Sequence, residues 1–445
     1  MRLKSLAIAM ALGTSLWSIC AQAADLMDIY KEAYARDPIV QQAKAARDKA
    51  FAAIDEATAA LLPQIDVAGS YTGYRTSDSS ISGVNANRRS AQAQVTLSQA
   101  LWQHSSWVNR SIAEKTAAQA DLAYNDALQN LIIRVSKAYF DVLNAADTLN
   151  YSKANNAALQ NRLDQANKQF NVGLIAETDR LEAQAAYDLS KAAVISAENA
   201  LINSYEEIRA LTGRPVEINE LNKLAVKRFS TPEVVETLKQ LIKNAEGNNL
   251  ALQQSAVARD IARDAIRLAK TGHEPIVALS ASAATGYTDY THETSTQVDG
   301  NAWTQSLGIG VNIPIYHGGA TSAQVAQAEA GYVQASQALE QAHRTLLTTV
   351  TSDYNNVNAA ISSVKAYNLS VKSAASALNA TSAGYDVGTR TMTDVLDATQ
   401  RLYSAMQQAA DARYKYILSR LNLSYAEGSL KVPDLEAVNS GLEKK

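Results

Sequence analysis

The chain has 445 residues, with 41 lysine and arginine residues against 44 aspartate and glutamate residues, and a formal net charge of -3 at pH 7. This slightly acidic balance argues against a nucleic-acid partner, which would require clustered positive charge. Proline (7 residues) and phenylalanine (4 residues) are scarce, a profile that favours long helices over a compact globule.

Residues 1–23 have the three parts of a secretory signal peptide. Two basic residues precede an uncharged run from residue 6 to residue 19, and the Ala-Gln-Ala at 21–23 fits the cleavage pattern. Cleavage after this tripeptide removes the only cysteine, Cys20, so we expect a thiol-free mature chain. The apolar run is short for a bilayer span and no later stretch approaches it, so we expect no membrane-spanning helix.

The remaining chain is an internal duplication, in which each half reads as helix, strand, strand, long helix and helix. We place the first structural repeat at 24–213, an equatorial insert at 214–248, the second repeat at 249–428 and a C-terminal tail at 429–445. Within the insert, Thr231-Pro232 predicts a short helix that ends before Gly247. The matching segments are 45–57 with 257–269, 62–74 with 274–287, and 170–183 with 385–398.

Four segments alternate between apolar and polar residues, which is the strand period. Each is about 10 residues long with aromatic residues at its ends, as in transmembrane β-strands. A half-buried antiparallel sheet in a soluble protein is the alternative interpretation. The four predicted strands are 64–74, 90–102, 276–287 and 303–315.

Four strands are too few to close a barrel, for which about 8 is the smallest useful number. An open sheet would leave unpaired backbone groups in lipid, so the chain must oligomerise. Three copies would supply 12 strands, an even number within the range of known barrels.

Two runs predict very long helices, one at 104–170 without proline or glycine and one at 319–384 without proline. At about 1.5 Å per residue, each would be roughly 100 Å long. A membrane with its headgroups is only about 40–45 Å thick, so these helices must project far into the periplasm. Shorter helices could stack end to end beside them, which makes an α-helical tunnel plausible. The predicted pairs of shorter helices are 24–61 with 179–211, and 249–270 with 391–426.

Several stretches carry a resemblance to the TolC family of outer-membrane efflux channels, which covers residues 24–432. The family implies an α+β membrane protein: a homotrimer with a 12-stranded transmembrane barrel above a coiled-coil periplasmic tunnel. It also implies an exit duct for drugs or proteins in the outer membrane of a Gram-negative bacterium. Its partners would be outer-membrane lipid, a periplasmic adaptor and an inner-membrane pump or ABC exporter, with no cofactor. The stretches are LLPQIDVAGSYT, AYFDVLNAADTL, QFNVGLIAETDRLEAQAAYD, NIPIYHGG and YDVGTRTMTDVLDATQRLY.

Two Val-Gly breaks lie at matching places in the two repeats. Glycine there could simply end one helix before the next begins, since it adopts positive φ without cost. The family resemblance implies a second role, in which these turns receive the hairpin tips of the adaptor. The docking segments would be Val172-Gly173-Leu174 and Val387-Gly388-Thr389.

The same resemblance implies a gate at the periplasmic end of the tunnel. Tyr385 and Arg390 would hold it shut, with Thr178 and Asp179 as partners on the neighbouring coil. Arg162 replaces the glutamine of close relatives, which leaves the partner of the tyrosine open.

Two acidic residues, Asp394 and Asp397, lie three apart on one helical face. In a trimer they would form a cation-binding ring in the bore, as the family resemblance implies. The alternative is that both occupy a solvated helix start, with Asp394 in a capping box with Thr391.

Catalysis is disfavoured, because the five histidines are scattered and no nucleophile or phosphate-binding motif is present. A coiled-coil filament or adhesin is the other alternative, but it would need neither the four strands nor the duplication.

Overall fold

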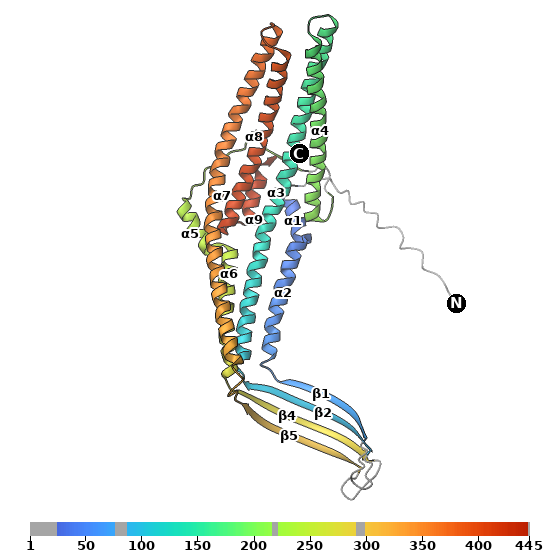
Figure 1. The fold of residues 1–445 in the computed structure, drawn as a ribbon, viewed down its shortest axis with the longest axis vertical. Coiled ribbons are helices and arrows are strands. Elements are labelled where there is room, and N and C mark those ends of the chain that lie inside the picture. Colours follow the sequence, from blue (N-terminus) through green and yellow to red (C-terminus); the bar gives the residue numbers. More distant parts are fainter. Residues whose placement is uncertain (1–24, 76–86, 216–220, 291–298, 444–445) are drawn as a thin grey trace, which may run out of the picture.

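The computed structural model describes residues 25–75, 87–215, 221–290 and 299–443. The predicted signal peptide lies outside these residues, as does part of each link between paired strands. A single sheet lies at one end of an elongated molecule, and long helices run from it to two helical turns at the other end (Figure 1).

The sheet is antiparallel throughout, with the strand order β1-β2-β4-β5. The prediction of four strands is therefore confirmed. The last predicted strand ended at 315, whereas β5 ends at Asn312, because Pro314 cannot donate a backbone hydrogen bond to the ladder. The strands are β1 (Gln64–Arg75), β2 (Asn87–Trp102), β4 (Ile276–Tyr290) and β5 (Gly300–Asn312).

The register gives the sheet one apolar and one polar face. Leu97 lies between Ala281 and Ile65, and Ala281 is in turn opposite Leu307. One residue along, the other face carries the row Asp66, Thr96, Ser282 and Ser306. Such alternation is typical of strands with lipid on one side and water on the other.

Two helices run the whole distance from the sheet to the far turns. They are α3 (His104–Asn171) and α7 (Ala320–Asp386), of 68 and 67 residues. Shorter helices stack beside them, so that α2 and α4 both contact α3 while α6 and α8 both contact α7. The shorter helices are α2 (Pro38–Ala59), α4 (Glu177–Thr212), α6 (Leu250–Lys270) and α8 (Met392–Glu427).

The first predicted helix, at 24–61, is broken in the structure. It divides into α1 (Leu26–Arg36) and α2, because Pro38 lacks an N–H and pushes Asp37 to ψ 122°. The Asp37 carboxylate then caps α2 by accepting a hydrogen bond from the Val40 N–H at 3.0 Å.

The insert and the tail pack together at the middle of the molecule (Figure 1). Strand β3 (Lys223–Leu224) of the insert pairs with β6 (Leu442–Glu443) of the tail, next to α9 (Val432–Ser440). The predicted start of the insert helix at Thr231-Pro232 is wrong. Helix α5 (Leu238–Asn248) begins later, because Thr237 caps it through the Gln240 N–H, and Gly247 lies inside it.

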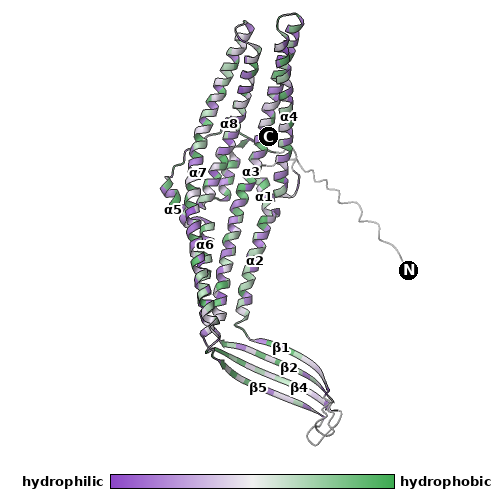
Figure 2. Cartoon of the chain, viewed as in Figure 1, coloured by the Kyte–Doolittle hydropathy of each residue, from purple (hydrophilic) through white to green (hydrophobic). Residues whose placement is uncertain are grey.

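The main hydrophobic core lies at the same middle level, where α1, α3, α4, α7 and α8 meet the insert. Tyr139 and Phe140 of α3 are both fully buried there, with ring centroids 5.6 Å apart. Apolar and polar residues are interspersed along the long helices (Figure 2). Among the helices of the described ranges, none combines the length and the apolar character needed to cross a bilayer.

Asp37 also forms a nearly buried ion pair, since Arg134 donates to its two oxygens at 2.8 and 2.9 Å. Burial alone would raise the pKa of Asp37, but the hydrogen bonds from Arg134 and Val40 outweigh it and leave the pKa below its usual value. The pair therefore stabilises the folded chain at neutral pH, and this contribution is lost as the pH falls through the lowered pKa.

We predict that Asp37→Ala destabilises the fold by about 2–4 kcal/mol, because it removes both the cap and the partner of Arg134. Asp37→Ser should cost less, because serine keeps a capping oxygen. Thermal unfolding followed by circular dichroism in detergent measures both. Equal midpoints for wild type and both variants would show that the pair contributes nothing.

Candidate functional site

The two helical turns farthest from the sheet have the same backbone geometry. In the first, the Gly173 N–H donates to the Phe170 carbonyl and the Leu174 N–H to the Gln169 carbonyl, both at 2.9 Å. With φ of 75° at Gly173, these bonds form a Schellman motif, which ends a helix on a left-handed residue.

The second turn repeats this motif. The Gly388 N–H donates to the Tyr385 carbonyl at 2.9 Å and the Thr389 N–H to the Gly384 carbonyl at 2.8 Å, with φ of 76° at Gly388. A Cβ atom at Gly173 or Gly388 would meet no atom within 4 Å. Within one chain, glycine is therefore required by the backbone angle and not by packing.

The apolar side chains of the turns are exposed. Val172, Leu174 and Val387 have 69%, 73% and 74% of their surface exposed. Together with the open glycines, they give each turn an accessible apolar surface with bare backbone beside it.

Three side-chain hydrogen bonds connect the hairpin α3–α4 to the hairpin α7–α8 near these turns. The Tyr385 hydroxyl donates to Gln169 Oε1 at 2.7 Å. Arg162 Nη2 donates to Ser382 Oγ at 3.0 Å, and Thr393 Oγ1 donates to Glu182 Oε2.

A small apolar cluster lies among these bonds, separate from the main core. It contains Leu159, Leu163 and Ala166 of α3, Ala183 of α4, and Met392 and Leu396 of α8, with Tyr385 packed against it. Burial raises the pKa of the Tyr385 hydroxyl, and the charge of Asp179 raises it further. Tyr385 is therefore a neutral donor, and Asp179 lies close enough to act on it electrostatically.

Arg390 folds back over the end of α7. A Cβ atom on Gly384 would lie 2.8 Å from Arg390 Cγ, so the absence of a side chain at Gly384 gives the arginine its place. Among the described residues of one chain, the guanidinium has no hydrogen-bond or ion-pair partner, and neither Thr178 nor Asp179 contacts it in this way. The predicted links from Arg390 would have to reach a neighbouring coil.

The predicted capping box is present at the start of α8. The Thr391 N–H donates to Asp394 Oδ2 at 3.0 Å, and the Asp394 N–H donates to Thr391 Oγ1 at 3.2 Å. These bonds, led by the one from the Thr391 backbone, hold the pKa of Asp394 below its usual value. Asp397 is largely exposed and forms an ion pair with Arg401 at 4.0 Å.

In the described part of the chain, no three histidine, cysteine, aspartate or glutamate side chains are placed to hold a metal ion. A cation site at Asp394 and Asp397 would therefore need carboxylates from other copies of the chain.

Sequence reasoning missed four of the residues that link the hairpins, namely Gln169, Glu182, Ser382 and Thr393. The duplication contained a signal for two of them, because it aligns Gln169 with Gly384 and Glu182 with Asp397. At the first position the two repeats differ in having a side chain that can hydrogen-bond, and at the second both repeats carry an acid, so each position stands out in the alignment. Nothing comparable singles out Ser382.

Comparisons with known proteins agree with this architecture. The family described as outer membrane efflux protein matches residues 29–214 and 241–429, one segment in each repeat. The outer membrane protein TolC of Salmonella enteritidis is 42% identical over 99% of this chain and 89% of its own length. TolC of Vibrio cholerae serotype O1 is 41% identical over 99% of both chains. The solved structure of the CmeC outer membrane channel of Campylobacter jejuni has a TM-score of 0.79 at 17% identity and covers 94% of this chain and 90% of its own.

Channels of this family are non-enzymatic trimers that serve efflux and secretion systems. The family matches both repeats, and the relatives match the chain over nearly its whole length. The chain therefore belongs to the outer membrane efflux protein family and is an outer-membrane channel of the TolC type.

Proposed function

We propose that three copies of this chain form the exit duct of a tripartite efflux pump or a type I secretion system, and that adaptor docking opens its periplasmic end. The family places the chain in the outer membrane of a Gram-negative bacterium, with the helices in the periplasm. One observation carries the proposal of opening: near the turns, three hydrogen bonds and one small cluster connect the two hairpins.

The trimer is supported by the sheet. Within the described chain, β1 and β5 each pair on one side only, so both present a free ladder edge. Because lipid offers no hydrogen bonds, three copies would join β5 of one protomer to β1 of the next and close a 12-stranded barrel.

The gate is supported by how little joins the hairpins. A neutral hydrogen bond such as that of Tyr385 to Gln169 contributes about 1 kcal/mol. Three protomers would multiply each such bond by three, so a partner that supplies a few kcal/mol of docking energy could separate the coils. The inner-membrane pump or ABC exporter would then pass drugs, toxic small molecules or proteins into the open duct.

Adaptor docking at the two turns can be distinguished from simple helix termination by asparagine, which tolerates positive φ but carries a side chain. We predict that Gly388→Asn, or Gly173→Asn, preserves the turn yet impairs efflux. A loss of ~1.4 kcal/mol in adaptor affinity lowers the affinity tenfold. Drug susceptibility of cells that express the variant measures the effect.

Gly213 provides a matched control. It also has positive φ, 72°, and open space at its Cβ position, but it ends α4 at the middle of the molecule. Gly213→Asn should leave efflux normal. Normal drug tolerance in Gly388→Asn, with trimer and surface level unchanged, would contradict docking at this turn.

The gate predicts a change in electrical conductance. Tyr385→Phe with Arg390→Ser should raise the single-channel conductance in planar bilayers, because removing about 1 kcal/mol per protomer weakens the closed state in all three copies together. Tyr332→Phe with Arg344→Ser makes the same chemical changes far from the turns, on α7, and should leave conductance unchanged. An unaltered conductance in the first variant would remove these residues from the gate.

An isosteric change can distinguish a role of Asp394 and Asp397 in a cation-binding ring from a role at the helix start. Asp394→Asn with Asp397→Asn removes both charges while an amide oxygen can still accept from the Thr391 N–H. We predict loss of cation preference and of block by trivalent cations, seen in reversal potentials and blocking titrations. Glu233→Gln with Glu236→Gln removes two charges from the insert and should change neither. Unchanged selectivity in the aspartate variant would show that Asp394 and Asp397 act only at the helix start.

A further inference from the structure

The last turns of α6 carry a row of cations that neither the gate nor the docking turns use. Arg263, Arg267 and Lys270 lie four and three residues apart, so they share one face of the helix. Arg263 and Arg267 have 57% and 69% of their side chains exposed, and Lys270 is also exposed. We call these three residues the α6 cationic row.

A β-bulge places Trp102 on the apolar, lipid-facing side of the sheet. Ala100 of β2 lies opposite Ala278, but Trp102 lies opposite Val277, so the bulge moves Trp102 onto the face of Val277. Val277 is itself opposite Val311, on the apolar face of the sheet. Trp102 is therefore on the lipid-facing surface, at the rim of the sheet next to the helices.

The helices continue this face. Trp107 of α3 packs on Trp102 with ring centroids 5.2 Å apart, and Ser111 lies one turn farther on the same side of α3. The Ser111 hydroxyl donates to Asp264 Oδ2 of α6 at 3.2 Å. Asp264 thus meets α3 on the side of α3 that carries Trp107, and Arg267 lies about one turn nearer the sheet than Asp264.

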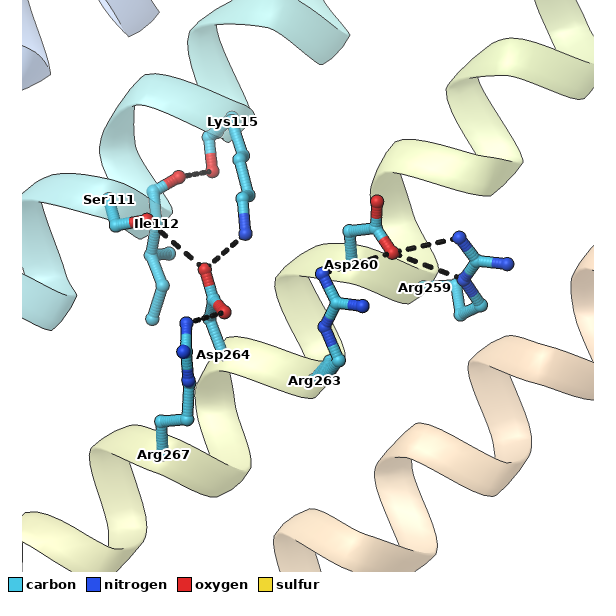
Figure 3. Close-up of polar contacts among 9 residues, drawn as sticks. Ser111, Ile112, Lys115, Arg259, Asp260, Arg263, Asp264 and Arg267 are labelled. Atoms are coloured by element: carbon cyan, nitrogen blue, oxygen red, sulfur yellow. Dashed lines mark hydrogen bonds and ion pairs between the residues drawn. The ribbon is translucent and has the colours of Figure 1, made fainter.

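Asp264 fixes this arrangement. Its side chain is fully buried, and Ser111, Lys115 and Arg267 converge on it while the Arg259–Asp260 pair lies one turn away (Figure 3). Arg267 contacts Asp264 Oδ1 through Nη1 at 3.3 Å. The rest of the guanidinium is directed to solvent, already oriented.

Positive charge exceeds negative charge on this surface. The segments 104–118 and 259–274 contain six lysine and arginine residues and four carboxylates. Each carboxylate already has a basic partner, whereas Lys270 has no ion pair or side-chain hydrogen bond among the described residues. The pairs are Glu114 with Arg110, Asp260 with Arg259, Asp264 with Lys115, and Glu274 with His104.

The row also lies at the depth of lipid headgroups. Lys270 is followed by one 3₁₀ turn and then by β4, which begins at Ile276. The row spans about 10 Å along the helix, and a headgroup layer is roughly 5–7 Å thick on each side of the hydrocarbon. Lys270, the residue of the row nearest the sheet, therefore lies at this layer, close to the tryptophan pair, a residue type typical of membrane interfaces.

We propose that the α6 cationic row binds anionic phospholipid headgroups of the periplasmic leaflet, with Trp102 and Trp107 at the hydrocarbon boundary. Helix α6 lies between α3 and α7 and β4 between β2 and β5, so this surface is away from the edges where copies of the chain would meet. It stays accessible to lipid in a closed ring. The lipid would fix the depth of the channel in the membrane and the position of the helices next to the barrel.

Native mass spectrometry of the purified full-length channel in mild detergent tests this, with titrations of phosphatidylglycerol and phosphatidylcholine of identical acyl chains. Wild type should prefer phosphatidylglycerol. Each cation near an anionic surface contributes about a fivefold gain, so R263Q/R267Q/K270Q should weaken phosphatidylglycerol binding by up to about 100-fold and leave phosphatidylcholine binding unchanged. The single variant K270Q, which touches no other side-chain partner, should lose about fivefold.

The matched control K239Q/R344Q/K365Q removes three exposed cations from the middle of the molecule and should bind like wild type. Equal phosphatidylglycerol affinity in the row variants and the control would overturn the proposal. So would equal affinity of wild type for the two lipids. Complete displacement of the lipid by millimolar inorganic phosphate would also overturn it, because the surface would then be a site for free phosphate.

Discussion

Hydrocarbon contains no water to hydrogen-bond a backbone N–H or C=O, and each unpaired group there costs several kcal/mol. Strands β2 and β4 satisfy this condition within the chain, since each has a partner on both sides. Strands β1 and β5 cannot do so alone. The same condition places small polar residues such as Ser282 and Thr96 on the inner face and valine and leucine on the outer face. The strand alternation and the need for further copies at the open edges thus both follow from the lack of hydrogen-bonding groups in hydrocarbon.

Below the sheet the solvent is water, and a different balance applies. The wall is built from helices in two stacked levels, and the large buried side chains gather where the levels meet. Toward the turns the apolar contacts become fewer, and side-chain hydrogen bonds such as Arg162 to Ser382 take their place. Packing thus becomes sparser from the middle of the molecule to the tips, where the proposed gate lies.

The architecture could be predicted from the sequence because it depends on periodicity and length. Strand alternation predicts the sheet, two runs of nearly 70 residues predict the long helices, and the duplication predicts how the helices pair. Pro38 indicates a break after Asp37, but the helical pattern on both sides of it predicts one continuous helix. Pro232 predicts a helix start, whereas in the structure Thr237 caps that helix. The links at the tips could not be predicted in the same way. Whether Tyr385 reaches Gln169 or another acceptor depends on how two hairpins, more than 200 residues apart in sequence, lie against each other.

The position of the main core has a mechanical consequence. Tyr139 of α3 is held in that core, and 32 residues of uninterrupted helix separate it from Asn171 at the turn. This is a stiff arm of roughly 50 Å, so a tilt of about five degrees around the core displaces the tip by roughly 4 Å. That distance exceeds the length of the hydrogen bonds that join the tips. In the proposed opening, the hairpins would act as levers that turn about the core, and the sheet on the far side of the core could stay still in the membrane.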